Sequence, residues 1–193
     1  MLTERSGSCA ICVLIVGEIC YVANVGDSRA ILSSNGGEQI TALSRDHKPS
    51  DVDEYRRIVQ GGGQIYQTTT AQCTNPQIKN ATDDQLEYII GPIRVLPGRL
   101  SVCRTFGDPE AKLEFRGGNP NVVKAEPEIT SFQISKNHDF IAMGSDGIFD
   151  KLTDEDAAKC VWNSCESAKT QLQMGKEINI PGQAKEPGQI SVH

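Results

Sequence analysis

Short apolar runs separated by turn residues dominate the first part of the chain. The runs ICVLIVG, EICYVANVG and SRAILSS meet at Gly17-Glu18 and at Gly26-Asp27, and Asn35-Gly36-Gly37 precedes a fourth run, EQITALS. Runs of this length that are rich in β-branched residues are typical of strands, and Asn-Gly is a strong hairpin signal. The pattern therefore predicts an antiparallel meander over the first 44 residues.

Two segments show the apolar spacing of a helix. The first follows Asp46-His47-Lys48-Pro49 and ends at Gly61-Gly62-Gly63, with Ser50 as the expected N-cap and an apolar stripe made of Val52, Tyr55, Ile58 and Val59. The second begins at Thr153, and its apolar face consists of Ala158, Val161, Trp162 and Cys165. For His47 we expect a loop histidine bonded to its neighbours, with a role as ligand or base as the alternative.

Elsewhere the periodicity is weak. Residues 68–84 are polar and contain Asn75-Pro76, which predicts an exposed loop or insertion. From residue 168 onward, Gly and Pro occur without an apolar period. We therefore expect one partial domain over residues 1–167 and a loosely ordered tail over residues 168–193.

The stretch Asp139–Asp150, read as DFIAMGSDGIFD, carries the clearest candidate chemistry. Phe140–Met143 is a short apolar run that suits a buried strand, and it stops at Gly144-Ser145-Asp146-Gly147. The two glycines allow a tight turn that leaves the Asp146 side chain free to point into a cleft. Asp150 follows four residues later, a spacing that suits metal binding. The alternative is that Asp146 caps the turn.

Composition narrows the functional classes. The 193 residues are enough to bury one good hydrophobic core. The 25 Asp plus Glu against 19 Lys plus Arg give a net charge of -6, and the sequence has no basic stripe, so we do not expect nucleic acid as a partner. The apolar run Ala10–Val16 is too short to span a bilayer and lacks a secretory pattern, so we expect no membrane association and a cytoplasmic or nuclear protein. Arg99 and Arg104 either attract an anion or pair with nearby carboxylates.

Seven short motifs, each weak alone, indicate a protein family when they are taken together and in order. They are SGSCA, VANVGDSRAIL, DHKP, a helix ending in GG, GRLSVCRTFGD, AEPEI and DFIAMGSDGIFD. In order and spacing, from Ser6 to about Cys165, the set resembles the metal-dependent Ser/Thr protein phosphatases of the PPM type, the protein phosphatase 2C family. The segment GPIRVLPGRLSVCRTFGDPEAK and the Gly-Gly-Asn-Pro loop look most like members from ciliates and related protists.

The resemblance implies an α+β fold, a β-sandwich of two antiparallel sheets flanked by helices. It implies that Asp146 binds the paired catalytic metals, and that Asp27 and Asp150 hold a further, weaker metal. Carboxylates converging within about 4 Å repel by several kcal/mol per pair, and oxygen ligands select Mg²⁺ or Mn²⁺. The implied reaction is hydrolysis of phosphoserine or phosphothreonine in a phosphoprotein by a metal-activated water. Cys9 is expected either to pack near this site or to have no role.

Two departures from the family pattern qualify this expectation. The family carries an upstream Arg that binds phosphate and an Asp-Gly-His-Gly segment whose Asp bridges both metals, and later an Asp-Asn motif; none of these occurs here. We therefore expect a fragment, incomplete at both ends, with no certain catalytic residue and an unpaired edge beside Ala10–Val16. The complete protein is expected to be a monomer. The alternative function is a non-catalytic, phosphatase-like binding module.

Overall fold

The computed structural model describes residues 5–73 and 86–177. The chain divides into two compact units, Met1–Ala158 and Lys159–His193. The first unit contains every strand of the described residues, and helix α4 (Asp154–Glu177) begins in it and continues into the second. No helix in these residues is both long and apolar enough to cross a membrane.

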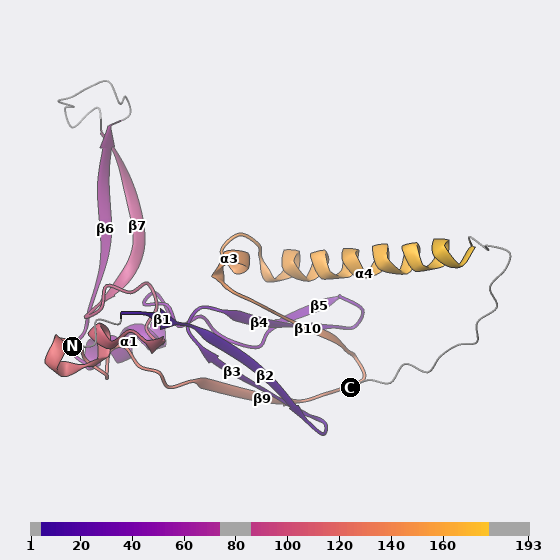
Figure 1. Cartoon of the computed structure of the whole chain (residues 1–193), viewed down its shortest axis with the longest axis horizontal. Coiled ribbons are helices and arrows are strands. Elements are labelled where there is room, and N and C mark those ends of the chain that lie inside the picture. Colours follow the sequence, from indigo (N-terminus) through magenta and orange to yellow (C-terminus); the bar gives the residue numbers. More distant parts are fainter. Residues whose placement is uncertain (1–4, 74–85, 178–193) are drawn as a thin grey trace. The chain divides into compact units, whose positions relative to one another are not determined.

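Two three-stranded antiparallel sheets form the centre of the first unit (Figure 1). One has the order β2 (Ala10–Val16), β3 (Ile19–Val25), β9 (Glu128–Gln133); the other has the order β10 (His138–Gly144), β4 (Arg29–Ser34), β5 (Gln39–Ala42). Cys20 and Val22 of the first sheet share a buried cluster with Ala30 of the second. Because the two sheets bury side chains against each other, the predicted β-sandwich and α+β class are confirmed.

The predicted meander is wrong at one point. Strands β3 and β4 do not pair; β3 lies between β2 and β9, and β4 lies between β10 and β5. The chain crosses from one sheet to the other at Gly26-Asp27-Ser28, where Gly26 has a φ of +115°, a value that L side chains rarely adopt. A connection that leads to the facing sheet and one that leads to the neighbouring strand both need a glycine turn, so the sequence pattern did not distinguish them.

The other elements of the first unit belong to neither of these two sheets. Strands β1 (Gly7–Ser8) and β8 (Phe106–Gly107) pair with each other, and β6 (Gln64–Cys73) pairs with β7 (Leu86–Leu96). The remaining elements are α1 (Val52–Gln60), α2 (Pro109–Lys112), the 3-10 helix η2 (Glu114–Arg116) and α3 (Asp146–Phe149). A second buried cluster joins α1 to β7 and the segments after it through Ile58, Val95, Cys103, Ala111, Val122 and Val123.

Three local expectations need correction. The N-cap of α1 is Asp51, whose side chain accepts from the backbone N–H groups of Asp53 and Glu54, and not Ser50. The predicted loop is strand β6 up to Cys73, because Thr69, Thr70 and Ala71 pair with Ile90, Ile89 and Tyr88; residues 74–85 lie outside the described residues. Helix α4 continues past the predicted start of the tail to Glu177, through a run of good helix formers, and residues 178–193 are outside the described part.

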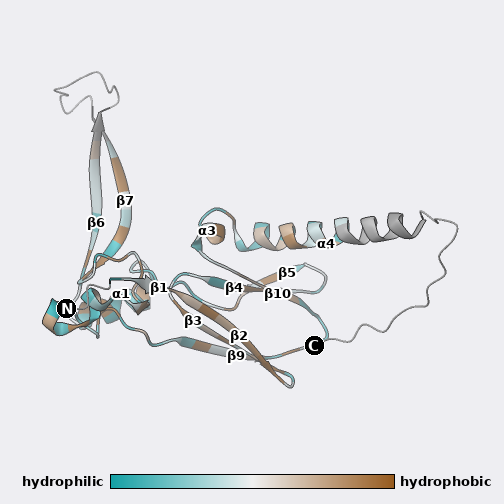
Figure 2. Cartoon of the chain, in the orientation of Figure 1, coloured by the Kyte–Doolittle hydropathy of each residue, from teal (hydrophilic) through white to brown (hydrophobic). Residues whose placement is uncertain are grey.

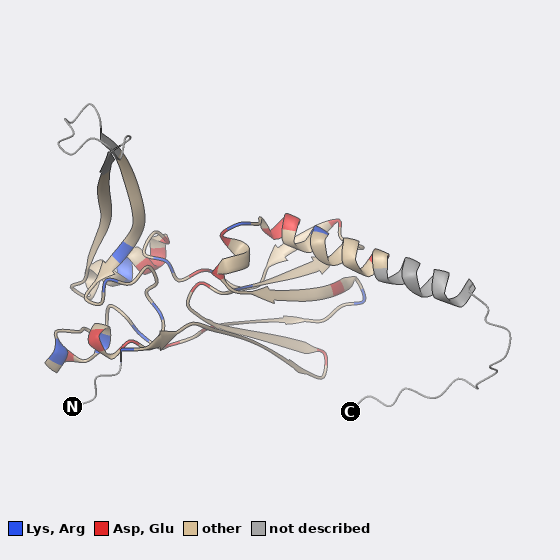
Figure 3. Ribbon diagram, turned by 45° about the horizontal axis from the view of Figure 1, so that its top comes forward, with Lys and Arg blue, Asp and Glu red and all other residues tan. Residues whose placement is uncertain are grey.

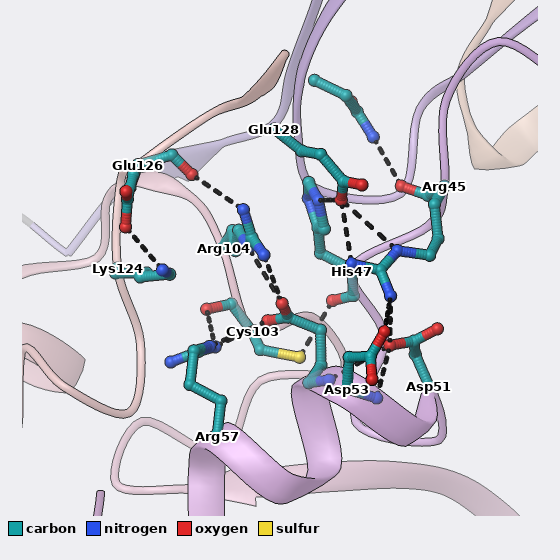
Figure 4. A network of polar contacts seen from close by, with 12 residues as sticks. Arg45, His47, Asp51, Asp53, Arg57, Cys103, Arg104, Lys124, Glu126 and Glu128 are labelled. Carbon is teal, nitrogen blue, oxygen red and sulfur yellow. Dashed lines mark hydrogen bonds and ion pairs between the residues drawn. The ribbon is translucent and has the colours of Figure 1, made fainter. Parts of the chain in front are cut away.

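Of the predicted apolar stripe of α1, Ile58 alone is buried. Val52, Tyr55 and Val59 are each at least half exposed, whereas Glu54 and Ile58 are buried. Both oxygens of the Glu54 carboxylate accept hydrogen bonds from guanidinium groups, Oε2 from Arg57 and Oε1 from Arg104. Arg57 also donates to the carbonyls of Asn121 and Val122, so it ties α1 to a distant segment. Figure 4 shows Arg57 and Arg104 within this network of polar contacts.

Burial, the largest influence on Glu54, raises the pKa of its carboxyl, but the hydrogen bonds from Arg104 and Arg57 outweigh it and lower the pKa to about 2. The ionised form is therefore favoured by folding. This contribution to stability is present above the ordinary glutamate pKa of about 4.5 and is lost as the pH falls towards about 2.

We expect Glu54→Gln to lower the free energy of unfolding at pH 7 by about 3 kcal/mol, because two partly buried guanidinium groups lose the charge of their buried partner. The variant should also lose part of the pH dependence of stability between about 4.5 and 2. Urea unfolding followed by circular dichroism at several pH values measures both effects. Glu38→Gln, at an exposed turn position, is the matched control; an equal loss in the control would contradict the prediction.

The outer face of the β2–β3–β9 sheet exposes apolar side chains. Figure 2 shows that β2 is largely hydrophobic. Leu14 lies opposite Tyr21 and Val16 opposite Ile19, and these four residues are between 39% and 57% exposed. In the sheet order, β2 is an edge strand. Acidic and basic residues lie mainly on other segments, and the strands are largely uncharged (Figure 3). A face of this kind favours association.

We expect the purified chain to associate as its concentration rises, and Leu14→Lys to reduce that association because a charge is placed in the centre of the apolar face. Size-exclusion chromatography with light scattering over a concentration series measures the mass. Val52→Lys, at an exposed position on α1, is the control. A monodisperse monomer of the unsubstituted chain at high concentration would show the prediction to be wrong.

Candidate active site

Asp27 lies in the short crossing between the two sheets. Its side chain is buried, and its carboxylate Oδ1 accepts a hydrogen bond from the Cys9 thiol at 3.4 Å. Gly26 is required here for space as well as for its φ, since a Cβ atom at this position would lie 2.2 Å from the Cys9 sulfur. The sequence left the role of Cys9 open, and the structure places its thiol against Asp27.

Burial raises the pKa of Cys9 to about 11, and the charges of Asp27 and Asp146 add to the increase. The thiol therefore stays protonated at neutral pH and acts as a donor. Ser8, its neighbour in the SGSCA motif, is exposed, and its hydroxyl donates to the Cys9 carbonyl.

His47 also holds the crossing through Gly26, and Figure 4 shows its ring next to Glu128. The backbone N–H of Gly26 donates to His47 Nδ1 at 3.1 Å, and the backbone N–H of His47 donates to the Gly26 carbonyl at 2.9 Å. Because Nδ1 accepts, the proton is on Nε2, which donates to Glu128 Oε2 at 3.0 Å. His47 is thus a buried histidine bonded to its neighbours.

Asp146 and Asp150 lie at the two ends of α3, directly after strand β10. The buried Phe149 holds this short helix against Ile31 of β4 and Ala157 and Ala158 at the start of α4. Within the described residues, the Asp146 side chain makes no hydrogen bond or ion pair, and the Asp150 carboxylate pairs with Lys48 Nζ at 2.9 Å.

One cavity of about 320 Å³ brings these groups together. All three predicted aspartates, Asp27, Asp146 and Asp150, contribute to its lining; the other lining residues are Lys48, Pro49, Ser50, Pro92, Ile93 and Ser101. A neighbouring cavity is also acidic, with Asp46, Asp51 and Asp154 in its lining, but there Arg29 pairs with both Asp46 and Asp154 and Arg45 pairs with Asp51.

The donor set of the first cavity suits a hydrated divalent cation. Carboxylate oxygens are the ligands of Mg²⁺ and Mn²⁺, and Mg²⁺ usually keeps several waters and takes one or two carboxylates. No group of three or more His, Cys, Asp and Glu side chains among the described residues encloses a single ion. The cavity therefore fits an open site, in which protein carboxylates supply part of the coordination.

The sequence did not predict that Lys48 lines the cavity with the three aspartates. Burial is the largest influence and lowers the pKa of its ammonium group, but the hydrogen bond to Asp150 and the charges of Asp150, Asp46 and Asp27 raise the pKa overall. The lysine is thus firmly charged. Arg104, for which an anion site was one alternative, pairs with Glu54.

A sequence model of protein phosphatase 2C matches residues 1–186. The chain belongs to the protein phosphatase 2C family. The predicted family is therefore confirmed, and the particular likeness to protist members stays a prediction.

Similar proteins agree with this family assignment. Over 171 residues the chain is 34% identical to probable protein phosphatase 2C 59 of rice, and the match covers 87% of this chain and 42% of that protein. It is 34% identical over 176 residues to the human integrin-linked kinase-associated serine/threonine phosphatase 2C, covering 89% of this chain and 36% of the human protein. The chain thus spans less than half the length of these relatives.

Solved structures show the same fold. A C. elegans sex determining protein superposes with a TM-score of 0.59 and 25% identity, over 80% of this chain and 31% of that protein. A serine-threonine phosphatase 2C from Toxoplasma gondii superposes with a TM-score of 0.57 and 16% identity, over 83% of this chain and 48% of that protein.

Burial lowers the pKa of His47, more than the hydrogen bond to Glu128 raises it. The neutral ring is therefore favoured by folding, and stability present above the ordinary histidine pKa of about 6.5 is lost as the pH falls below it. Protonation at Nδ1 would also remove the acceptor for the Gly26 N–H.

We expect His47→Leu to lower the free energy of unfolding by roughly 1–3 kcal/mol, because the buried Gly26 N–H loses its acceptor. His47→Asn places an amide oxygen near the position of Nδ1 and should recover part of this loss. Both variants should also lose the His47 contribution to the fall in stability below pH 6.5. Urea unfolding at several pH values tests the series; an asparagine variant no more stable than the leucine variant would contradict it.

Proposed function

We propose that this chain forms part of a metal-dependent protein serine/threonine phosphatase, with Asp27, Asp146 and Asp150 in its active site. The observation that carries the proposal is the cavity into which the fold brings all three aspartates. Its support is the membership of the chain in the protein phosphatase 2C family. A phosphoprotein substrate, a cytoplasmic or nuclear location and a monomeric state of the complete protein remain predictions.

The roles of the residues follow from their surroundings. Asp146 is exposed to the cavity and pairs with no cation among the described residues, so its oxygens are available to Mg²⁺ or Mn²⁺. Asp27 is buried and held by the Cys9 thiol, which orients its carboxylate. A divalent cation held by these carboxylates would supply Lewis-acid activation of water for hydrolysis of a phosphate ester. Lys48 adds a positive charge to the same wall.

A second candidate function is a non-catalytic, phosphatase-like binding module. The observation in its favour is that no three acidic, cysteine or histidine side chains of the described residues enclose one ion. In this case the cavity would bind a partner without hydrolysing it.

The test is hydrolysis of a phosphothreonine peptide by the 193-residue chain with and without Mn²⁺. Activity should require the metal, and Asp146→Asn should lower it by at least about tenfold, because a ligand oxygen is lost. Asp53→Asn, which removes an exposed carboxylate of α1 outside the cavity, is the control. Inactivity of the unsubstituted chain, with retained binding of the phosphopeptide, would favour the binding module.

A further inference from the structure

Lys48 lies between two acidic groups of residues. Its ammonium nitrogen is 2.9 Å from Asp150 Oδ1 and 3.5 Å from Asp46 Oδ2, and it contributes to the lining of both cavities that these carboxylates face. Among the residues that line the cavity with Asp27, Asp146 and Asp150, Lys48 is the one cation.

The backbone on both sides of Lys48 is fixed. His47 is buried, and its carbonyl accepts hydrogen bonds from the backbone N–H and the thiol of Cys103. Pro49 is fully buried, and the Lys48 carbonyl accepts from the N–H of Asp51 at 2.9 Å. The side chain can therefore change its partner by rotation, while its starting point stays in place.

Asp46, the second carboxylate near the Lys48 ammonium group, is also held in place. Asp46 receives two hydrogen bonds from the guanidinium group of Arg29, at 3.1 and 2.9 Å, and Arg29 reaches Asp154 at 2.7 Å. Asp46 therefore keeps its position whether or not Lys48 is bonded to it, and it offers the ammonium group a second carboxylate within a short distance.

We propose that Lys48 is a displaceable counter-ion, which competes with a divalent cation for Asp150 and moves to Asp46 when the cation binds. The ammonium group and the metal ion need the same carboxylate oxygens, and two cations cannot share one carboxylate at close range without repulsion. The inference rests on the proposed function in that Asp150 must be accessible to the metal. It adds that Lys48 sets the affinity of this site.

The experiment measures Mn²⁺ affinity directly, from the decrease of the electron paramagnetic resonance signal of free Mn²⁺ as protein is added. Lys48→Met should bind Mn²⁺ roughly five- to tenfold more tightly than the unsubstituted chain, because one competing ion pair is removed. Lys136→Met, in the turn between β9 and β10, changes the net charge equally and should leave the affinity unchanged. Circular dichroism confirms that each variant is folded.

A second pair of variants separates competition from general charge. In an Asp150→Asn background, Lys48→Met should no longer raise the Mn²⁺ affinity, because the shared carboxylate is gone. Equal affinity of Lys48→Met and the unsubstituted chain, an absence of Mn²⁺ binding in all variants, or an undiminished effect in the Asp150→Asn background would each overturn the proposal. The readout is metal affinity, so a failure of peptide hydrolysis alone tests the proposed function and not this inference.

Discussion

The candidate site depends on the reciprocal hydrogen bonding of Gly26 and His47. Each residue donates its backbone N–H to the other, to the ring Nδ1 in one direction and to the carbonyl in the other. In the chain, Asp27 follows Gly26 and Lys48 follows His47. The two hydrogen bonds therefore fix the backbone beside one carboxylate and beside the lysine of the same cavity. The ring of His47 also reaches Glu128, and its carbonyl reaches Cys103, so four segments distant in sequence meet at this residue.

Arginine and lysine hold carboxylates differently in the first unit. Glu54, Asp46 and Asp51 are held by guanidinium groups, whose planar fork of donors fixes a carboxylate in one orientation. The cavity carboxylates have weaker or more mobile partners: Asp27 has a thiol, and Asp150 has the flexible ammonium group of Lys48. Carboxylates that pair with arginine stabilise the fold. Carboxylates without an arginine partner remain available to a ligand.

The sequence identified the components of the fold better than their connections. The glycine turns, the α1 helix stop and the strand before Asp146 were predictable from local pattern, because each depends on neighbouring residues. The crossing at Gly26-Asp27-Ser28 was not, because strand partners are chosen by packing between distant segments. The burial of Glu54 was hidden for the same reason, since its partner Arg104 lies on another segment. Lys48 belongs to the DHKP motif, but its position between Asp150 and Asp46 is a property of the folded chain.

Charge balance explains why the place of one lysine matters. Asp46 and Asp154 share the single positive charge of Arg29, and the remaining negative charge of this group faces Lys48 at 3.5 Å while the ammonium group bonds Asp150 at 2.9 Å. With Lys48 bound to Asp46 instead, the group is neutral, and the three carboxylates of the cavity are left to a divalent cation. When a metal ion is bound, both the Asp46–Asp154 group and the cavity carboxylates carry less unbalanced charge. Electrostatics therefore favours the movement of Lys48 from Asp150 to Asp46.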